Sequence, residues 1–431
     1  MAVWIIEPHD PLIVRDGKPF DISAGARSTS LAFPFPSTTT GGVRTRAGLN
    51  DKGVFDLHKK DIPELKKLAV RGPLLVQLNG EDSGELLVFA PLDALLFSPE
   101  EGKETPGQAI LQQLVPLLIR EGIAYAEFSR YKGEPLAVVG LVHPEVSKPA
   151  KNTPLYWHWK KFERWLIDPK KECHTITMNE QGHNGPQREQ RTHVSIDAER
   201  ASADEGMLFT TSGLEFTHIE KGSLSHESKD YTLSNAKRLA LAMIVDERNT
   251  FATKLQDGLT GFGGERRIVS WRKSGIAIPS CPEEIVQEVV NKKACRVILL
   301  TPAYFARGYY PTWLLQEQHG VEPVLKAIAV QRPQVISGWD LDLKGPKPTR
   351  RLTPAGTVLF LSLKNSSDEA IREWIDKIWM YCVSDDSEAS NNPEENCMDG
   401  FGVAVIGTWS GKPEEIDWSK KNDEPANKET A

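Results

Sequence analysis

Short apolar segments of strand length recur along the whole chain, and a few amphipathic helical segments lie between them. Examples of the strand-like segments are AVWIIE (2–7), RLALAMIV (238–245) and GVAVIGTW (402–409). Glycine and proline residues separate many of these segments, as is typical of strands joined by turns. The sequence therefore predicts an α+β fold, and its 431 residues are enough for two or three domains with cores of their own.

Both halves of the chain mix strands and helices in a way that is compatible with repeated βαββαβ units. We expect paired strands at 71–82 and 84–91, and a hairpin of 173–178 with 192–197 around a polar loop. Expected helices lie in the 40s and at 155–169, 282–290 and 368–382, and 111–122 has apolar positions at mixed helical spacing, interrupted by Pro116. The apolar face of the 155–169 helix would contain Leu155, Trp157, Trp159, Phe162, Trp165 and Leu166.

Charge and cysteine content exclude several classes of protein. The formal net charge of −7 argues against indiscriminate nucleic-acid binding, although a local basic face remains possible because screening limits distant charges to about 8–10 Å. The five cysteines are scattered and predict neither disulfides nor a zinc site. No basic leader precedes the first apolar segment and no segment is long enough to span a membrane, so we expect a cytoplasmic protein without metal or cofactor.

The stretch FPFPSTTTGGVRTRAG (33–48) combines hydroxyl groups, two glycines and two arginines. One interpretation is a helix that Ser37 or Thr38 caps, with Arg44 and Arg46 facing water. The other interpretation uses the same geometry to bind phosphate, because a helix N-terminus presents free N–H groups and a partial positive charge. The stretch alone leaves both interpretations open.

The segment GLTGFGGERR (258–267) places three glycines in four positions ahead of two arginines. It matches neither a Walker loop nor the dinucleotide fingerprint. Such a loop offers backbone amides and guanidinium groups to an anion, and we interpret it as a phosphate-binding loop. Two further segments, DLKGPKPTRRL (342–352) and DGFGVAVIGTW (399–409), have a basic run and a glycine-rich approach to a strand, and each is equally compatible with a purely structural role.

Two histidines are candidates for proton transfer. Arg191 and His193 alternate along an expected edge or hairpin strand, so both would point to one face. His9 precedes Asp10 between two prolines, which favours a rigid turn. No Ser-His-Asp or Cys-His arrangement can be deduced around either residue, and a structural role is expected for both.

Taken together, these motifs resemble the RAMP proteins of CRISPR systems, and within them the subunit of the type III-B (Cmr) effector complex that holds the crRNA 5′ handle. The resemblance is carried by segments in the family's order: 6–20, 33–48, 192–209, 261–267, 299–305, 338–356 and 399–409. It implies two ferredoxin-like, RRM-type domains, here an N-terminal domain (1–170) and a C-terminal domain (231–411), with a β-hairpin thumb region (171–230) inserted and a flexible tail (412–431).

The resemblance also implies a function, namely a non-enzymatic RNA-binding subunit of an antiviral ribonucleoprotein. Its expected partners are crRNA, the large polymerase/cyclase-like subunit and the backbone RAMP subunit, with target RNA contacted indirectly. The alternative is a metal-independent RAMP endoribonuclease that processes CRISPR RNA with His9 or His193 as general base. The residues that would bind RNA are Ser37, Thr38, Thr39, Arg44, Arg46, Arg191, His193, Gly261, Gly263, Gly264, Arg266, Arg267, Lys347, Arg350 and Arg351.

Overall fold

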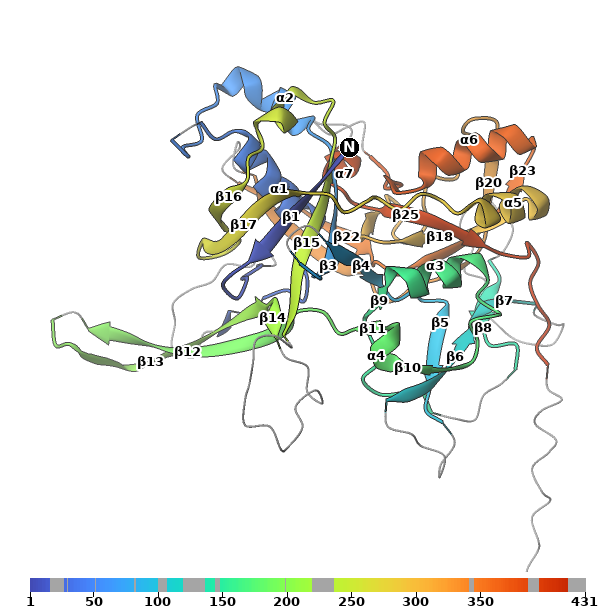
Figure 1. The fold of residues 1–431 in the computed structure, drawn as a ribbon, viewed down its shortest axis with the longest axis horizontal. Coiled ribbons are helices and arrows are strands. Elements are labelled where there is room, and N and C mark those ends of the chain that lie inside the picture. Colours follow the sequence, from blue (N-terminus) through green and yellow to red (C-terminus); the bar gives the residue numbers. More distant parts are fainter. Residues whose placement is uncertain are drawn as a thin grey trace, which may run out of the picture.

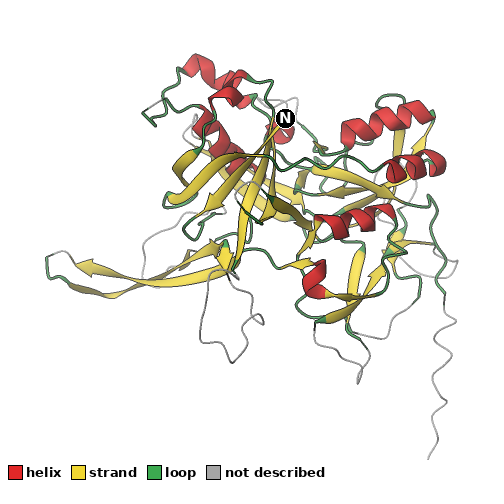
Figure 2. Ribbon diagram, in the orientation of Figure 1, coloured by secondary structure: helices red, strands yellow, loops and turns green. Residues whose placement is uncertain are grey.

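Two antiparallel β-sheets form the body of the protein, and a long β-hairpin projects from it (Figure 1). The computed structural model describes residues 1–15, 27–28, 30–50, 52–80, 83–99, 107–118, 136–143, 148–197, 199–218, 236–340, 345–386 and 395–417. Figure 2 shows groups of helices at the upper left and at the right of the molecule, and further short helices near its centre. The predicted mixture of strands and helices is confirmed.

The larger sheet has nine strands and is built around the N-terminal strand β1 (Ala2–Pro8). The strand order is β11-β9-β4-β3-β15-β1-β17-β16, and β14 pairs with β15. Helix α1 (Pro36–Ala47) lies between β1 and β3 in the chain, and a short 3-10 helix (Thr250–Lys254) follows β15. The other strands are β3 (Val70–Leu78), β4 (Gly84–Phe89), β9 (Tyr156–His158), β11 (Gly182–His183), β14 (Thr217–His218), β15 (Lys237–Val245), β16 (Gly258–Phe262) and β17 (Arg267–Ser274).

The smaller sheet has five strands in the order β20-β23-β18-β25-β24. They are β18 (Ala294–Leu299), β20 (Glu322–Ala329), β23 (Val358–Lys364), β24 (Tyr381–Cys382) and β25 (Val403–Thr408). Helix α5 (Glu283–Lys292) precedes β18, and α6 (Asp368–Ile378) connects β23 to β24. The helix expected at 282–290 is confirmed as α5. The helix expected at 368–382 is confirmed as far as Ile378, whereas Tyr381–Cys382 form strand β24. Ser367 caps α6 by accepting a hydrogen bond from the backbone N–H of Ala370 at 3.2 Å.

The central four strands have the same order in both sheets. If the strands of each unit are numbered along the chain, β3-β15-β1-β17 and β20-β23-β18-β25 both read second, third, first, fourth, and all neighbours are antiparallel. The first unit has α1 in its first crossover, whereas residues 300–321 between β18 and β20 contain no helix. Residues 237–274, which the sequence analysis places in the C-terminal domain, pair with β1 and β3 in the first sheet.

Both faces of β1 are buried, which explains its continuous apolar sequence. Val3 and Ile5 belong to a core that extends through α3 (Trp159–Ile167) to the second sheet. Trp4 and Ile6 face the opposite way, into a core that includes Val43 of α1. The two sheets therefore share one continuous apolar core, and α1 covers the far face of the first sheet.

A buried ion pair crosses the contact between the two sheets. Arg296 of β18 pairs with Asp93, which follows β4, and both side chains are 0% exposed. Arg296 also donates from Nε to the Thr408 carbonyl at 2.7 Å, and Trp165 of α3 donates from Nε1 to Asp93 at 3.0 Å. Because every strong donor and acceptor of the pair has a partner, the two charges are tolerated in an apolar core.

The projecting hairpin consists of β12 (Gln187–Asp197) and β13 (Ser202–Glu215). The predicted hairpin of 173–178 with 192–197 is therefore wrong: β10 (Thr175–Thr177) pairs with β6 (Gln108–Gln113), while β12 pairs with the segment that follows it along the chain. The turn of the hairpin is the short connection between β12 and β13. The polar residues 179–191, which were expected to form the turn, instead contribute to α4, β11 and β12.

Two segments with helical spacing of their apolar residues also differ from expectation. Residues 108–113 and 115–117 form strands β6 and β7 (Val115–Leu117), and in β6 the alternation of buried Ala109 and Leu111 with more exposed neighbours has the period of a strand. The helix expected from residue 155 begins at Trp159, because 156–158 pair with β4 as β9. Leu155 is consequently 57% exposed rather than part of the apolar face.

Smaller elements complete the fold. They are β2 (Arg27–Ser28), β5 (Ala94–Phe97), β8 (Val138–Gly140), β19 (Ala303–Tyr304), β21 (Gln334–Asp340), β22 (Gly345–Thr353), the 3-10 helix Lys59–Asp61, α2 (Ile62–Lys66), α4 (Met178–Gln181) and α7 (Glu395–Met398). Most of the expected tail, 418–431, lies outside the described residues.

Candidate nucleic-acid interface

Helix α1 begins differently from the sequence expectation. Pro36 is its first residue and Phe35 is its N-cap, with no side-chain capping bond, so neither Ser37 nor Thr38 caps the helix. The Thr39 hydroxyl donates to the Pro36 carbonyl at 3.0 Å, inside the helix. Ser37 and Thr38 are half-buried, and their hydroxyl groups make no hydrogen bond to another described residue. These two hydroxyls therefore remain available at the first turn.

The two arginines of α1 do not face water. Arg44 forms an ion pair with Asp399, with 2.6 Å between Nη1 and Oδ1, and its side chain is 14% exposed. Its Nε and Nη2 also donate to the Leu68 carbonyl at 3.3 and 3.2 Å. Arg44 thus ties α1 to the segment after α7 and to the approach of β3, and the sequence interpretation of a solvated arginine is wrong.

Arg46, two residues further along α1, is also held by contacts within the protein. Its Nε donates to the Gln256 carbonyl at 2.7 Å, and its guanidinium lies 5.6 Å from the ring centroid of Trp271. Burial lowers the pKa of Arg46, and the nearby Asp257 carboxylate opposes this effect. RNA contacts by Arg44 and Arg46 stay predictions, since both guanidinium groups already have protein partners.

The glycines of 261–267 allow close packing against two other motifs. Gly263 has a φ of +71°, and a Cβ there would lie 2.6 Å from the Ile13 carbonyl oxygen. Gly264 donates its N–H to the same oxygen at 2.7 Å. A Cβ on Gly42 of α1 would lie 2.4 Å from the ring of Phe262. The loop therefore packs directly against α1 and against the segment that follows β1. Within the turn, a Cβ on Gly261 would lie 2.9 Å from the Cβ of Arg266.

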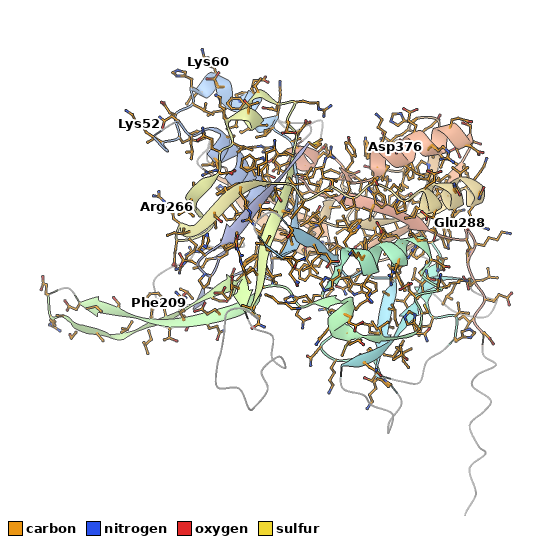
Figure 3. The ribbon with its side chains drawn as sticks, viewed as in Figure 1. Lys52, Lys60, Phe209, Arg266, Glu288 and Asp376 are labelled. Carbon is orange, nitrogen blue, oxygen red and sulfur yellow. The ribbon has the colours of Figure 1, made fainter. Side chains whose placement is uncertain are left out.

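The two arginines of this loop have different surroundings. Arg266 is exposed at the edge of the molecule above the projecting hairpin (Figure 3) and makes no ion pair or hydrogen bond with another described residue. Its φ is +48°, an uncommon conformation for a residue with a side chain. Arg267 pairs with Glu265, with 2.7 Å between Nη2 and Oε2, and is 19% exposed.

The basic run in β22 lies beside α7 and the segment that follows it. Lys347 pairs with Glu395, and Arg350 bonds to the Asn396 side chain. The Arg350 guanidinium also lies 5.0 Å from the centroid of the Phe401 ring. Arg351 is exposed and makes no such contact with another described residue.

The glycine-rich segment 399–402 has a packing role. A Cβ on Gly400 would lie 2.7 Å from the Val70 carbonyl oxygen, and Gly400 has a φ of +91°. On its α1 side, Thr40 donates to the Asp399 carbonyl at 2.8 Å. The segment thus connects α1 to β22, and Phe35 packs in one small apolar cluster with Leu352 of β22 and with Phe401.

The base of the hairpin lies close to the glycine loop, and predicted site residues of β12 are found there. Arg191 is 47% exposed and pairs with Glu189 at 2.6 Å between Nε and Oε1. His193 Nε2 lies 2.8 Å from the Thr211 hydroxyl, and its ring stacks on Phe209 at a centroid distance of 5.0 Å. Arg191 and Arg267 line the same small pocket. The His193 contacts are with a hydroxyl and an aromatic ring, which positions the imidazole as a stacking surface.

The structure therefore brings most of the predicted site residues into two groups that lie next to each other. α1, the loop 261–267, the segment 395–402 and β22 adjoin one another, and the hairpin base joins the loop from the other side. Glu189 and Glu265, the counter-ions of two site arginines, were not identified from the sequence. The signal for them is that each lies two residues before its arginine.

Within the described residues, no group of three or more His, Cys, Asp and Glu side chains is arranged to hold a metal ion. Across the same part of the chain, none of the helices combines the length and the apolar character that crossing a bilayer requires.

Comparison with family models identifies the class of protein. The model described as CRISPR-associated protein (Cas_Cmr3) matches residues 4–409, nearly the whole chain. The chain therefore belongs to the Cmr3 family of CRISPR-associated proteins.

Two solved structures resemble the chain at 14% sequence identity and a TM-score of 0.46. One is a cryo-EM structure of type III-B Cmr-beta bound to cognate target RNA and AMPPnP, where the match covers 96% of this chain and 99% of the other. The second is the same kind of complex bound to cognate target RNA, with 96% and 98% covered. A comparison with curated proteins found no match.

Proposed function

We propose that this chain is a non-enzymatic RNA-binding subunit of a type III-B Cmr complex, which holds the repeat-derived 5′ handle of crRNA and joins the large polymerase/cyclase-like subunit to the backbone RAMP filament. Membership of the Cmr3 family supports the proposal. The observation that carries it is the contact between α1, the glycine loop 261–267 and the segment 395–402, which gathers separate basic and glycine-rich motifs on one side of the fold.

We further propose that each sheet belongs to a ferredoxin-like unit and that the hairpin β12–β13 is the inserted thumb. The shared strand order of the two sheets supports the first part. The first unit would then close with β15 and β17, so residues 237–274 belong to it rather than to the C-terminal unit.

The contacts divide the site residues into two groups with different proposed roles. Arg266, Arg351, Ser37 and Thr38 have polar groups without protein partners among the described residues and would contact RNA phosphates or sugar hydroxyls directly. Eight further residues would shape the surface: Thr39, Arg44, Arg46, Lys347 and Arg350 through bonds within the protein, and Gly261, Gly263 and Gly264 through close packing. His193 would offer its ring to a base.

Replacing Arg266 and Arg351 by alanine tests this assignment. The tagged chain is purified with its partners, and the amount of RNA recovered per mole of chain is measured as salt is raised. For single-stranded RNA, loss of each phosphate contact lowers the slope of log affinity against log salt by about 0.7, so the double variant should lose about 1.4. Sequencing of the RNA should give short molecules that share one constant 5′ segment.

Arg372→Ala is the matched control, because Arg372 is an exposed arginine on α6 whose partner is Glu283. It should retain RNA with the slope of the unmodified chain. The assignment is refuted if the double variant also has the unmodified slope, and the function itself is refuted if the chain co-purifies with partners but never with RNA.

A further inference from the structure

A small pocket lies where the base of the hairpin meets the glycine loop. Its lining comes from three parts of the chain: Pro11 and Ile13 after β1, Arg191 with its neighbours in β12 and β13, and Arg267 at the start of β17. Two arginines that lie 76 positions apart in the sequence therefore share one concave site.

The pocket is fixed by backbone contacts rather than by side chains alone. Leu12 and Leu214 exchange two backbone hydrogen bonds of 2.8 Å, which attaches the segment after β1 to the hairpin base. One residue later, the Ile13 carbonyl accepts the bond from Gly264. A Cβ on Gly213 would lie 2.8 Å from Pro11, so this glycine permits the close approach. Residues 11–13 therefore hold the hairpin base and the glycine loop at a set distance from each other.

Both arginines keep hydrogen-bonding capacity that the protein does not use. Arg191 engages Glu189 through Nε, and Arg267 engages Glu265 through Nη2. The Nε of Arg267 is buried and has no acceptor among the described residues. A buried donor without an acceptor calls for a partner, and a planar guanidinium matches the geometry of a phosphate group.

Each arginine is paired with one glutamate while the pocket is empty, and the carboxylates of Asp10 and Glu215 also act on Arg191. Glu189 and Glu265 are 35% and 42% exposed, and ion pairs at such positions are weak because water and salt screen them. A phosphate can therefore take the place of either carboxylate, and the displaced glutamate can turn into solvent.

We infer that this pocket binds one phosphodiester group of the single-stranded RNA through Arg191 and Arg267, and that Glu189 and Glu265 are counter-ions which the phosphate displaces. The inference rests on the proposed RNA-binding function and adds to it one defined subsite and a means of discrimination. Because the carboxylates of Glu189, Glu265, Asp10 and Glu215 surround the arginines of the empty pocket, it attracts stray polyanions weakly and is filled by RNA that other contacts already hold in place.

Neutralising one RNA linkage at a time tests the subsite. A methylphosphonate at a single position removes one charge, and binding to the full chain in its purified complex is measured for each position along the handle. With the unmodified chain, we expect a position that weakens binding and that no longer does so in the Arg191→Ala/Arg267→Ala variant, while the effects at other positions persist. Arg188→Ala removes an exposed charge from the opposite face of β12 and should preserve the unmodified pattern.

The outcomes separate the subsite from the function. If every position keeps its effect in the double variant, the pocket does not contact RNA phosphate and the inference is overturned, although RNA binding stands. If inorganic phosphate raises the melting temperature of the unmodified chain but not of the double variant, and every methylphosphonate position keeps its effect in the double variant, the pocket binds free phosphate instead of RNA. If no RNA binds at all, the proposed function fails together with the inference.

Two further variants test the counter-ions. Glu189→Gln and Glu265→Gln leave the size of each side chain almost unchanged and remove the competing charge. Each should tighten binding of RNA with an unrelated sequence by about two- to five-fold, which is the strength of an exposed ion pair. Unchanged or weaker binding of unrelated RNA would show that the carboxylates do not compete with phosphate.

Discussion

The ion pair between Asp93 and Arg296 should be among the most sensitive points of the fold. In Asp93→Asn the side chain keeps its shape, and Arg296 is left as a buried charge with only carbonyl groups around it. Breaking a buried pair on one side costs about 3–5 kcal/mol. Typical domains have a total unfolding free energy of about 5–15 kcal/mol, so the variant should lose a large part of its stability.

Urea unfolding followed by tryptophan fluorescence measures this loss, and Trp165, which donates to Asp93, is one of the reporters. The midpoint should fall while the slope m stays constant, because the same surface is exposed on unfolding. The double variant Asp93→Leu/Arg296→Met removes both charges and should be more stable than Asp93→Asn. The exposed pair of Arg372 and Glu283 is the control, and its loss should cost less than about 1 kcal/mol.

Two results would refute this reasoning. One is a loss below about 1 kcal/mol in Asp93→Asn, which would mean that the site behaves like an exposed pair. The other is a double variant whose loss equals the sum of the losses in Asp93→Leu and Arg296→Met measured singly, because residues in direct contact should be strongly coupled.

Further predictions concern pH and packing. Burial opposes ionisation of Glu7, but hydrogen bonds from two arginines outweigh it and lower the pKa of Glu7 below its ordinary value of 4.5. The stability from this carboxylate should be complete above pH 4.5 and be lost as the pH falls through the lower folded-state pKa, and urea midpoints of Glu7→Gln should lack this part of the acid dependence. In α1, Gly41→Ala meets no atom within 4 Å and should raise the unfolding free energy by about 1 kcal/mol, since alanine favours helix. Gly42→Ala would place a methyl group against Phe262 and should lower it by about 1–3 kcal/mol, and a midpoint for Gly42→Ala at or above the unmodified one would contradict the packing.

Much of the fold follows from local sequence patterns. The strands 2–8, 237–245 and 403–408 are continuous apolar runs, and α5 and α6 have clear amphipathic patterns, so these elements are predictable. Strand pairing is different, because it depends on residues far apart in the sequence. Nothing near 173–178 shows that its partner is β6, and nothing near 237 shows that β15 lies between β1 and β3.

The candidate site shows the same difference between what local sequence predicts and what depends on tertiary contacts. The sequence identifies the glycine loop and the arginines by residue type. It does not show which guanidinium groups are already engaged, because the partners of Arg44 and Arg46 lie 355 and 210 positions away. The close approach of Gly42 to Phe262 is likewise a tertiary contact, and the glycine alone indicates only that some close contact or flexibility is needed.

The position of β15 has a consequence for synthesis of the protein. This strand lies between β1 and β3, yet it leaves the ribosome more than 200 residues after β1. At ordinary translation rates of about 5–20 residues per second, the apolar β1 must wait roughly 10–50 s for its neighbour. During that time its hydrophobic surface and unpaired edge are open to other chains, so we expect nascent chains halted before residue 237 to depend on chaperones and to aggregate when released.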